Sequence, residues 1–330
     1  MKSTLTLKNI YKVSFSEDHC AFTDLIQNPF SDQEVTFLCC YRSATNHVSD
    51  DGVIRIHKFN RTMDVKEDMT LSLENTDLRD PKFVFDGKRL LITAFAKTKH
   101  TTRPFNRTSM VSYLSINGRD WEGPFTFSQD NNWIWRTTWH QGAAYGFAYN
   151  RAAQKLDLYC GDPTHNMALL TEHALSLEKH QAGYPNESHL LFDESSNATA
   201  IVRRDADTYS AKLGFSSPPY TEWTWKDLGI YIGGPVMIRL EENFFLVAGR
   251  DWDEEDDKLT TKVWLLDVTE PKLTELLTLP SAGDNSYPGL CVIEDTAYLS
   301  YYSSHEDDQT SVYFAEINGV NALLDVIKQT

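Results

Sequence analysis

The segment "YPNESHLLFDESSNATAIVRRD", residues 184–205, has the pattern of two strands joined by a polar turn. Residues 189–192 and 198–202 are predominantly apolar, and the stretch DESSN between them consists of turn-forming residues. Glu187 lies just before the first strand, and Arg203 follows the second. These two places lie side by side in an antiparallel hairpin. The segment therefore predicts a carboxylate and a guanidinium together at the open end of a hairpin.

Five further segments along the chain resemble the second strand of this hairpin. Each is short, rich in β-branched and aromatic residues, and preceded by another strand-like segment and a turn. The six segments end at Arg42, Lys97, Asn150, Arg203, Arg250 and Tyr302, which by subtraction gives intervals of 55, 53, 53, 47 and 52 residues.

Two more strand-like segments follow each of these six, so each unit of about 50 residues holds four strands. This pattern predicts an all-β fold, a six-bladed β-propeller of four-stranded antiparallel blades, formed as a single domain by residues 1–330. A pair of β-sandwiches without a true repeat is the alternative.

Two turns support the repeat. "SINGRDW" (residues 115–121) is similar to a degenerate Asp-box turn, and "SSPPYTEW" (residues 216–223) keeps the same spacing from serine to tryptophan. We expect both to lie on the outer turns of blades, far from the centre, with the tryptophan packed beneath the turn.

Composition restricts the functions to be considered. The net charge is −16, which disfavours nucleic acid as a partner because such a surface repels phosphate. No apolar run approaches about 18 residues, so no membrane span is expected, and the N-terminal stretch has no apolar region of a secretory signal. The five cysteines show no C-x-x-C spacing, which is typical of reduced thiols in the cytoplasm.

Polar residues at the ends of the first two strands of each unit are expected to meet at one mouth of the central channel. The first strands contribute Asp24, Asp80, Arg136, Glu187, Pro235 and Tyr287, and the second strands contribute the six residues at which they end. Two interpretations remain open. The charges could pair with one another and fill the channel, or the arginines could form a cleft that binds a carboxylate.

The chain resembles the sialidase superfamily over nearly its whole length. The stretches that carry the resemblance are "HCAFTDLI", "CYRSATNHVSDDGVIRIH", "DLRDPKF", "WRTTWHQGAAYGFAYN", "PNESHLLF", "IVRRD", "PPYTEWTWKDLG", "GGPVMIRL", "VAGRD" and "SYPGLCVIEDTAYLSYYSSHE". The resemblance implies that Tyr287 is the nucleophile and Glu187 its base, and that Arg203 and Arg250 are the second and third arginines that bind the sugar carboxylate.

The sequence departs from the family pattern at two places. The first arginine of the family is absent from "FTDLI", and Arg42, one strand further on, could replace it only from another direction. The loop expected to hold the acid/base aspartate reads "SATNHVSDDG", with His47, Asp50 and Asp51 as candidates. Asp80, in "LRDP", is the preferred general acid, and Asp50 is the second choice. A structural capping role at the start of a strand is the alternative for Asp80.

Other residues were considered as ligand contacts. Trp135, beside Arg136, is the candidate for stacking on a sugar, whereas Trp139 is expected in the core. The acidic run "DWDEEDD" lacks the spacing of a calcium loop and is expected to be a solvated loop. No third ligand is close in sequence to His47 or His305, so both are expected to form hydrogen bonds at the rim, where His47 is a candidate substrate-binding residue. No metal or other cofactor is expected.

The resulting hypothesis is a cytoplasmic glycoside hydrolase of sialidase-like type that acts with retention on a carboxylate-bearing sugar. The alternative is a propeller that binds a glycan or a protein and has lost catalysis, an idea motivated by the missing first arginine.

Overall fold

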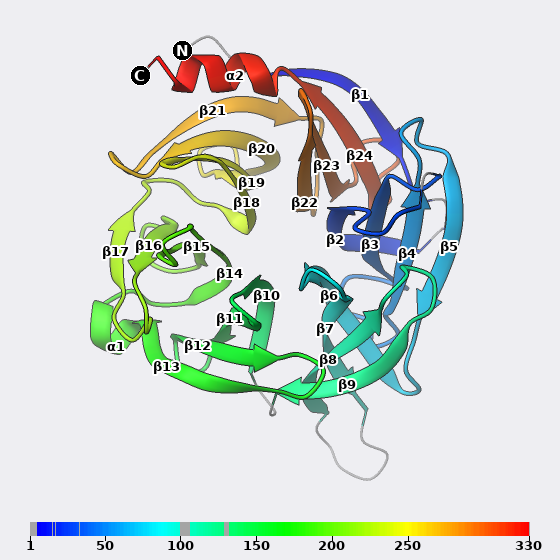
Figure 1. Cartoon of the computed structure of the whole chain (residues 1–330), viewed down its shortest axis with the longest axis horizontal. Coiled ribbons are helices and arrows are strands. Elements are labelled where there is room, and N and C mark those ends of the chain that lie inside the picture. The colour runs from blue at the N-terminus through cyan, green and yellow to red at the C-terminus, as the bar shows by residue number, and fades with distance from the viewer. Residues whose placement is uncertain are drawn as a thin grey trace.

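Six four-stranded antiparallel sheets stand around a central axis in the computed structural model of the chain (Figure 1). The structure describes residues 5–14, 16, 18–32, 34–99, 106–128 and 132–329. The predicted six-bladed propeller is confirmed, and the pair of sandwiches is excluded. That one domain spans all of residues 1–330 stays a prediction. Part of the N-terminal stretch considered for a secretory signal, residues 1–4, lies outside the described ranges.

The first three blades follow one another along the chain. Blade 1 contains β2 (His19–Gln27), β3 (Phe37–Ala44), β4 (Val53–Phe59) and β5 (Val65–Leu71). Blade 2 contains β6 (Thr76–Phe85), β7 (Leu90–Thr98), β8 (Arg107–Ser115) and β9 (Glu122–Ser128). Blade 3 contains β10 (Trp133–His140), β11 (Ala143–Asn150), β12 (Lys155–Asp162) and β13 (Asn166–Ser176).

The last three blades continue around the ring, and the sixth takes its outer strand from the N-terminus. Blade 4 contains β14 (Pro185–Phe192), β15 (Ala198–Arg204), β16 (Lys212–Ser216) and β17 (Thr224–Asp227). Blade 5 contains β18 (Gly233–Glu241), β19 (Phe244–Asp253), β20 (Lys258–Asp267) and β21 (Lys272–Leu279). Blade 6 contains β22 (Ser286–Ile293), β23 (Thr296–Ser303), β24 (Ser311–Asn318) and β1 (Thr6–Lys12).

The pairing of β1 with β24 closes the ring. The two strands run antiparallel, with Ile10 opposite Ala315, so the two ends of the chain are held in one sheet. Closure of this kind ties the first and last described strands together, so the ring can open only if the hydrogen bonds between β1 and β24 break.

The residues of a blade become more exposed from its second strand to its outermost strand. All eight residues of β3 are buried because neighbouring blades cover both faces of the sheet. The outer strand β5 instead alternates between exposed and partly buried residues. This difference explains why the second strands read as continuous apolar runs in the sequence, whereas the outer strands carry a weak signal.

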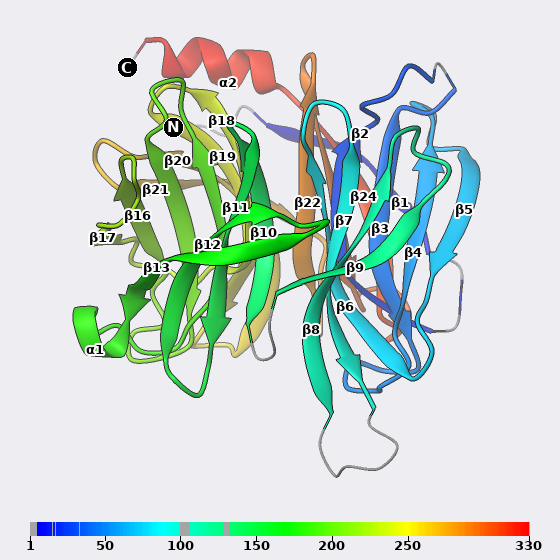
Figure 2. The ribbon, with the colours of Figure 1, turned by 60° about the horizontal axis from the view of Figure 1, so that its bottom comes forward.

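Two short helices complete the described part of the chain, α1 (Leu177–His180) and α2 (Val320–Ile327). α2 lies against the outside of the ring beside β21 and β1 (Figures 1 and 2) and buries Val320, Leu323 and Ile327 there. None of the described helices has the length and apolar character that a membrane span requires.

Both predicted Asp-box turns join the third and fourth strands of their blades. Ser115 Oγ accepts the Gly118 N–H at 2.8 Å in the turn after β8, and Trp121 packs against the core there. Ser216 Oγ donates to the Glu222 carbonyl at 2.6 Å in the turn before β17, and Trp223 is buried. The prediction of their outer position is confirmed.

Ring closure makes a prediction at Gly289 of β22. A Cβ atom there would lie 2.0 Å from Leu25 N and 2.6 Å from Asp24 C, both backbone atoms of β2 in the next blade. Because backbone cannot swing aside, Gly289→Ala should lower the free energy of unfolding by about 1–3 kcal/mol, as overpacking does. Urea unfolding measures the difference.

Gly183→Ala is the matched control. Its Cβ would meet the flexible end of the Gln154 side chain at 2.9 Å, which can move, so stability close to that of the wild type is expected. Equal stability of Gly289→Ala and the wild type would show that blades 6 and 1 are not in the close contact described.

Candidate functional site

Every inner strand carries a β-bulge at the same level of the ring. In each blade two residues of the inner strand oppose one residue of the second strand. The six bulged pairs are Phe22–Thr23, Asp80–Pro81, Trp135–Arg136, Asn186–Glu187, Gly234–Pro235 and Tyr287–Pro288. A bulge bends its strand and redirects its side chains, so this ring of bulges determines what lies at the mouth of the channel.

Glu187 and Tyr287 come from bulges of blades 4 and 6 and meet at the channel. The Tyr287 hydroxyl donates to Glu187 Oε1 at 2.7 Å, although 100 residues separate the two in sequence. Arg203, which lies opposite the bulge of blade 4, donates from Nη1 to Glu187 Oε2 at 2.8 Å and to the Tyr287 hydroxyl at 2.6 Å. The structure thus brings these three predicted site residues into direct contact.

The pKa of Tyr287 lies well above its ordinary value. Burial is the main cause, and the Glu187 carboxylate raises the pKa further, while Arg203 and Arg250 oppose the rise. The phenol is therefore protonated at neutral pH, with its proton held in the hydrogen bond to Glu187. Any reaction that uses the phenolic oxygen needs this carboxylate to take the proton.

Arg250 lies on the other side of Tyr287. Its guanidinium carbon is 4.9 Å from the centre of the Tyr287 ring. Arg250 donates to the Asn285 carbonyl, to Asp284 Oδ1 at 2.7 Å and to the Tyr302 hydroxyl at 2.9 Å. The four residues Glu187, Arg203, Arg250 and Tyr287 therefore converge on one end of the channel.

A cavity of about 780 Å³ opens beside the two arginines. Arg203, Arg250 and Asp205 line it together with the aromatic side chains of Tyr209, Tyr231 and Trp252. Among the described residues, no hydrogen bond involves Nη2 of Arg203 or Nη1 of Arg250. Each guanidinium thus keeps one end available to a ligand in the cavity.

Arg136, a predicted substrate-binding residue, is instead part of a buried ion pair. Its Nη1 lies 3.0 Å from Asp24 Oδ1, and its Nη2 donates to the Pro288 carbonyl. Asp24 Oδ2 accepts the backbone N–H of Phe83, and the fully buried Lys82 donates to the Thr23 carbonyl. These side chains fill the channel, so the geometry corrects the expectation for Arg136.

Arg42 and Trp135 are also withdrawn from solvent. Arg42 is 0% exposed, and its guanidinium donates to Asp77 Oδ1 and to the carbonyls of Asn46 and Ser49, which leaves it as a support of the loop after β3. Trp135 is 1% exposed and packs edge-on against the Tyr287 ring at 5.9 Å. Because the ring faces of Trp135 are buried, it cannot stack on a sugar here. Tyr209, Tyr231 and Trp252 offer the aromatic surface instead.

The two candidate acids have opposite environments. Asp80 is buried in its bulge with φ of 48°, and among the described residues its Oδ1 has no hydrogen-bond partner. Burial and the Glu187 charge raise the pKa of Asp80, although Lys82 opposes them. Asp50 pairs with Lys97, and this hydrogen bond lowers its pKa. Of the two carboxyls, only Asp80 has a pKa shifted upward, which is the direction that a general acid requires.

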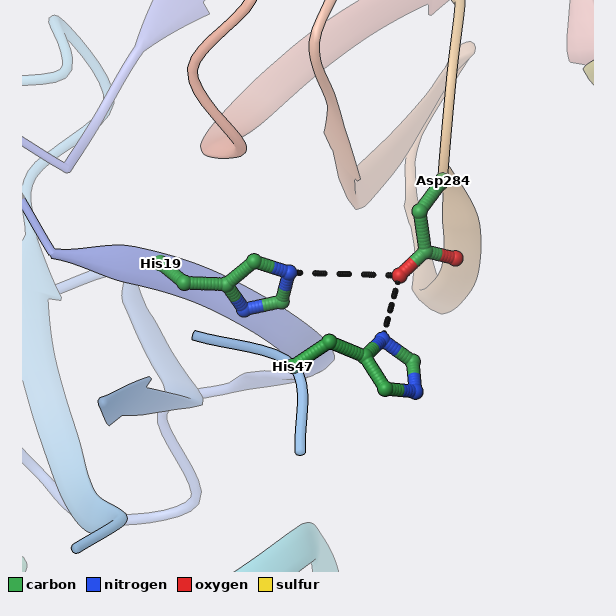
Figure 3. Close-up of side chains that lie close together, drawn as sticks. All are labelled: His19, His47 and Asp284. Carbon is green, nitrogen blue, oxygen red and sulfur yellow. Dashed lines mark hydrogen bonds and ion pairs between the residues drawn. The ribbon is translucent and has the colours of Figure 1, made fainter. Parts of the chain in front are cut away.

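His47 lies on the loop after β3 and contacts Asp284, as Figure 3 shows. The distance from His47 Nδ1 to Asp284 Oδ2 is 2.6 Å, and His19 Nε2 lies 3.9 Å from the same oxygen. Burial is the main cause that lowers the pKa of His19 to about 4. The pKa of Asp284 falls to about 2, because the His47 hydrogen bond and the Arg250 charge outweigh the effect of burial.

Several residues of this region were missed by sequence reasoning. Asp205, which accepts from Arg203 Nε at 2.8 Å, follows Arg203 by two residues in "IVRRD" and could have been found from that spacing. Trp252 belongs to the acidic run that was interpreted as a solvated loop. Asp284 and His19 carry no local signal, because only the meeting of blades 6 and 1 places them together.

Comparison with known proteins identifies the fold. No protein-family model matches the chain, and no curated protein matches it. A protein of unknown function from Dyadobacter fermentans has a similar structure, with a TM-score of 0.78 and 15% identity over 96% of this chain and 99% of that one.

A sialidase and an arabinanase of known structure also share the fold. The Trypanosoma rangeli sialidase in complex with the inhibitor DANA has a TM-score of 0.67 and 11% identity over 94% of this chain. This chain spans 57% of the sialidase's length. The α-L-arabinanase of Penicillium chrysogenum complexed with arabinobiose has a TM-score of 0.67 and 10% identity over 96% of this chain and 99% of that one. The chain thus has the sialidase-like six-bladed propeller fold.

The channel ion pair makes a stability prediction. Arg136→Met leaves Asp24 charged and buried without its partner, so the free energy of unfolding should fall by about 3–5 kcal/mol. The double variant Asp24→Asn/Arg136→Met should recover part of the loss. Urea unfolding measures these differences. Arg61→Met is the control: Arg61 is exposed and lies 3.5 Å from Glu294, so this substitution should change the free energy of unfolding by less than about 1 kcal/mol. A fully stable Arg136→Met protein would contradict the role of Arg136 in filling the channel.

The environment of Asp80 makes a prediction about pH. Because its pKa is raised, the folded protein holds this proton more tightly than the unfolded chain does. The charged carboxylate therefore destabilises the fold above the folded pKa, and this effect disappears below the ordinary value of 3.8. Asp80→Asn should be more stable than the wild type at pH 7, and the difference should shrink on acidification in thermal unfolding.

Asp50→Asn is the control, and its effect on stability at pH 7 should have the opposite sign to that of Asp80→Asn. Its lowered pKa stabilises the fold above the ordinary value, so its removal should decrease stability at pH 7 and have no effect below the folded pKa. If Asp80→Asn is instead less stable at pH 7, the carboxylate is a structural cap of the strand.

Proposed function

We propose that this chain is a glycoside hydrolase that acts with retention on a carboxylate-bearing sugar, with Tyr287 as the nucleophile and Glu187 as its base. The observation that carries the proposal is the 2.7 Å hydrogen bond from the Tyr287 hydroxyl to Glu187 Oε1. The similarity of the fold to sugar-binding propellers supports it.

The first chemical step forms a bond between the Tyr287 oxygen and the anomeric carbon of the sugar. The phenolic proton passes to Glu187 as this bond forms, and Arg203 Nη1, 2.6 Å from the same oxygen, stabilises the negative charge that develops. The bond from the anomeric carbon to the leaving oxygen breaks, and a general acid protonates that oxygen.

Asp80 is the proposed general acid. Burial raises its pKa and the nearby Glu187 charge raises it further, and an upward shift favours the protonated form that a general acid needs. In the second step water attacks the anomeric carbon as the bond from that carbon to the Tyr287 oxygen breaks. Asp80 takes a proton from the water, and Glu187 returns its proton to the released Tyr287 oxygen. Both carboxyl groups thus regain their starting states.

The two arginines support a carboxylate as the part of the substrate that is recognised. Arg203 is neutralised by Glu187 and Asp205, and Arg250 by Asp284, so the site holds no excess of positive charge. The free ends of the two guanidinium groups nevertheless line one cavity, where each can donate to a ligand oxygen. The aromatic wall of Tyr209, Tyr231 and Trp252 suits the apolar face of a sugar ring.

The nucleophile makes the central prediction. Aryl glycosides of sialic acids, related ulosonic acids, uronic acids and arabinose should be assayed, and at least one acidic sugar should be hydrolysed. Tyr287→Phe removes only the phenolic oxygen, so kcat should fall by about 10³-fold or more while the substrate still binds.

Tyr301→Phe is the matched control, because its buried hydroxyl donates to the Pro280 carbonyl and does not contact Glu187. Its activity should equal that of the wild type. An active Tyr287→Phe enzyme would exclude the tyrosine as nucleophile. Binding of these sugars without turnover of any would identify the chain as a non-catalytic glycan-binding propeller.

A further inference from the structure

His19, His47 and Asp284 form a cluster at the mouth of the channel that the proposed hydrolysis does not use. His19 opens β2, His47 lies on the loop between β3 and β4, and Asp284 lies between β21 and β22. Figure 3 shows both imidazoles directed at the same carboxylate. One ligand atom from each of the three residues lies within 4.8 Å of the other two.

We propose that this cluster binds a divalent first-row transition metal, with zinc as the ion to test. Two imidazoles and one carboxylate are the donor set that such ions prefer, whereas calcium and magnesium favour oxygen ligands alone. Three protein ligands leave at least one coordination position for water or for a small anionic ligand.

The distances are compatible with a metal centre. Two ligands about 2.0–2.1 Å from a tetrahedral zinc ion lie about 3.3 Å from each other. The observed distances from Asp284 Oδ2 are 2.6 Å to His47 Nδ1 and 3.9 Å to His19 Nε2, so small movements of opposite sense bring both to that value. His47 is 49% exposed and lies on a loop, which allows such a movement and gives an ion access.

The second carboxylate oxygen is already held in place. Asp284 Oδ1 accepts from Arg250 Nη2 at 2.7 Å and from the Tyr302 hydroxyl at 3.0 Å, and this leaves Oδ2 for the two imidazoles. Ligating carboxylates are commonly oriented by outer partners of this kind. Arg250 is a nearby positive charge that opposes a cation, but it is bonded to the oxygen that does not face the imidazoles.

A hydrogen bond between His47 and Asp284 alone does not account for His19. At 3.9 Å from Asp284 Oδ2, His19 Nε2 is too far away for a hydrogen bond. The other ring nitrogen, Nδ1, is buried and has no partner among the described residues. A half-buried imidazole directed at a shared carboxylate without a bond to it is explained by an ion between them.

Calorimetric titration of the chelator-treated, dialysed protein with zinc chloride tests the site. We expect one ion per chain for the wild type and at least ten-fold weaker binding for His47→Ala and His19→Ala. His47→Ala alters an exposed loop residue, so its fold should be intact by circular dichroism. His165→Ala is the matched control, because this exposed histidine lies 3.9 Å from Asp162 and, among the described residues, belongs to no group of three metal-ligating side chains, so the zinc affinity of this variant should be unchanged.

Magnesium and calcium chloride should give no comparable binding. Absence of zinc binding by the wild type, or equal affinity of both site variants and the wild type, would overturn the proposal. The titration requires no turnover, so its outcome is independent of the glycoside assays. Tyr287→Phe should retain the zinc site even if it has lost hydrolysis.

Discussion

The bulge in each of the six inner strands is the constraint on which the functional face of this propeller depends. Two residues oppose one at the same level in every blade, and the chain adopts a left-handed conformation at Phe22, Asp80 and Tyr287, with φ of 59°, 48° and 48°. A regular strand would alternate its side chains between the two neighbouring blades. The bulge breaks this alternation and places Glu187 and Tyr287 together at the mouth of the channel.

Charge along the channel axis is organised in two levels. One level is a set of buried groups: Arg136 donates to Asp24, Asp24 also accepts the backbone N–H of Phe83, and Lys82 donates to the Thr23 carbonyl. The other level, at the mouth, keeps free donors on Arg203 and Arg250 beside a cavity. The first interpretation offered by the sequence, charges that pair and fill the channel, thus describes Arg136 and Asp24, because a buried charge needs a partner. The second, a cleft that binds a carboxylate, stays a proposal for Arg203 and Arg250.

Asp80 illustrates how such a site departs from the rules that stabilise the rest of the fold. It combines a left-handed backbone, a buried carboxyl oxygen without a partner among the described residues, and a raised pKa. Each of these features destabilises a protein, and their coincidence at one residue beside Glu187 is typical of a functional position. Lys82 and Trp135 oppose the rise of its pKa, so the carboxyl is not without favourable neighbours.

The sequence by itself determined the ring and one local pair. The interval of about 50 residues is visible because the second strands, of which β3 is buried over its whole length, are predominantly apolar. Glu187 and Arg203 could be paired because a hairpin of adjacent strands brings them together whatever the rest of the chain does. Tyr287 could be added to them only through the family resemblance and the geometry of a closed ring.

Only the tertiary structure decided which arginines at the rim keep a donor for a ligand and which have all their donors directed at protein groups. Arg42 and Arg250 hold equivalent places, each opposite the residue that precedes a bulge, yet Arg42 is enclosed by Asp77 and loop carbonyls, whereas Arg250 lines the cavity. His47 had no third partner in the sequence, but the closure of the ring brings His19 and Asp284 to it. The reason is physical: partners that meet across blades are set by the packing of loops from distant segments, and no spacing along the chain records that packing.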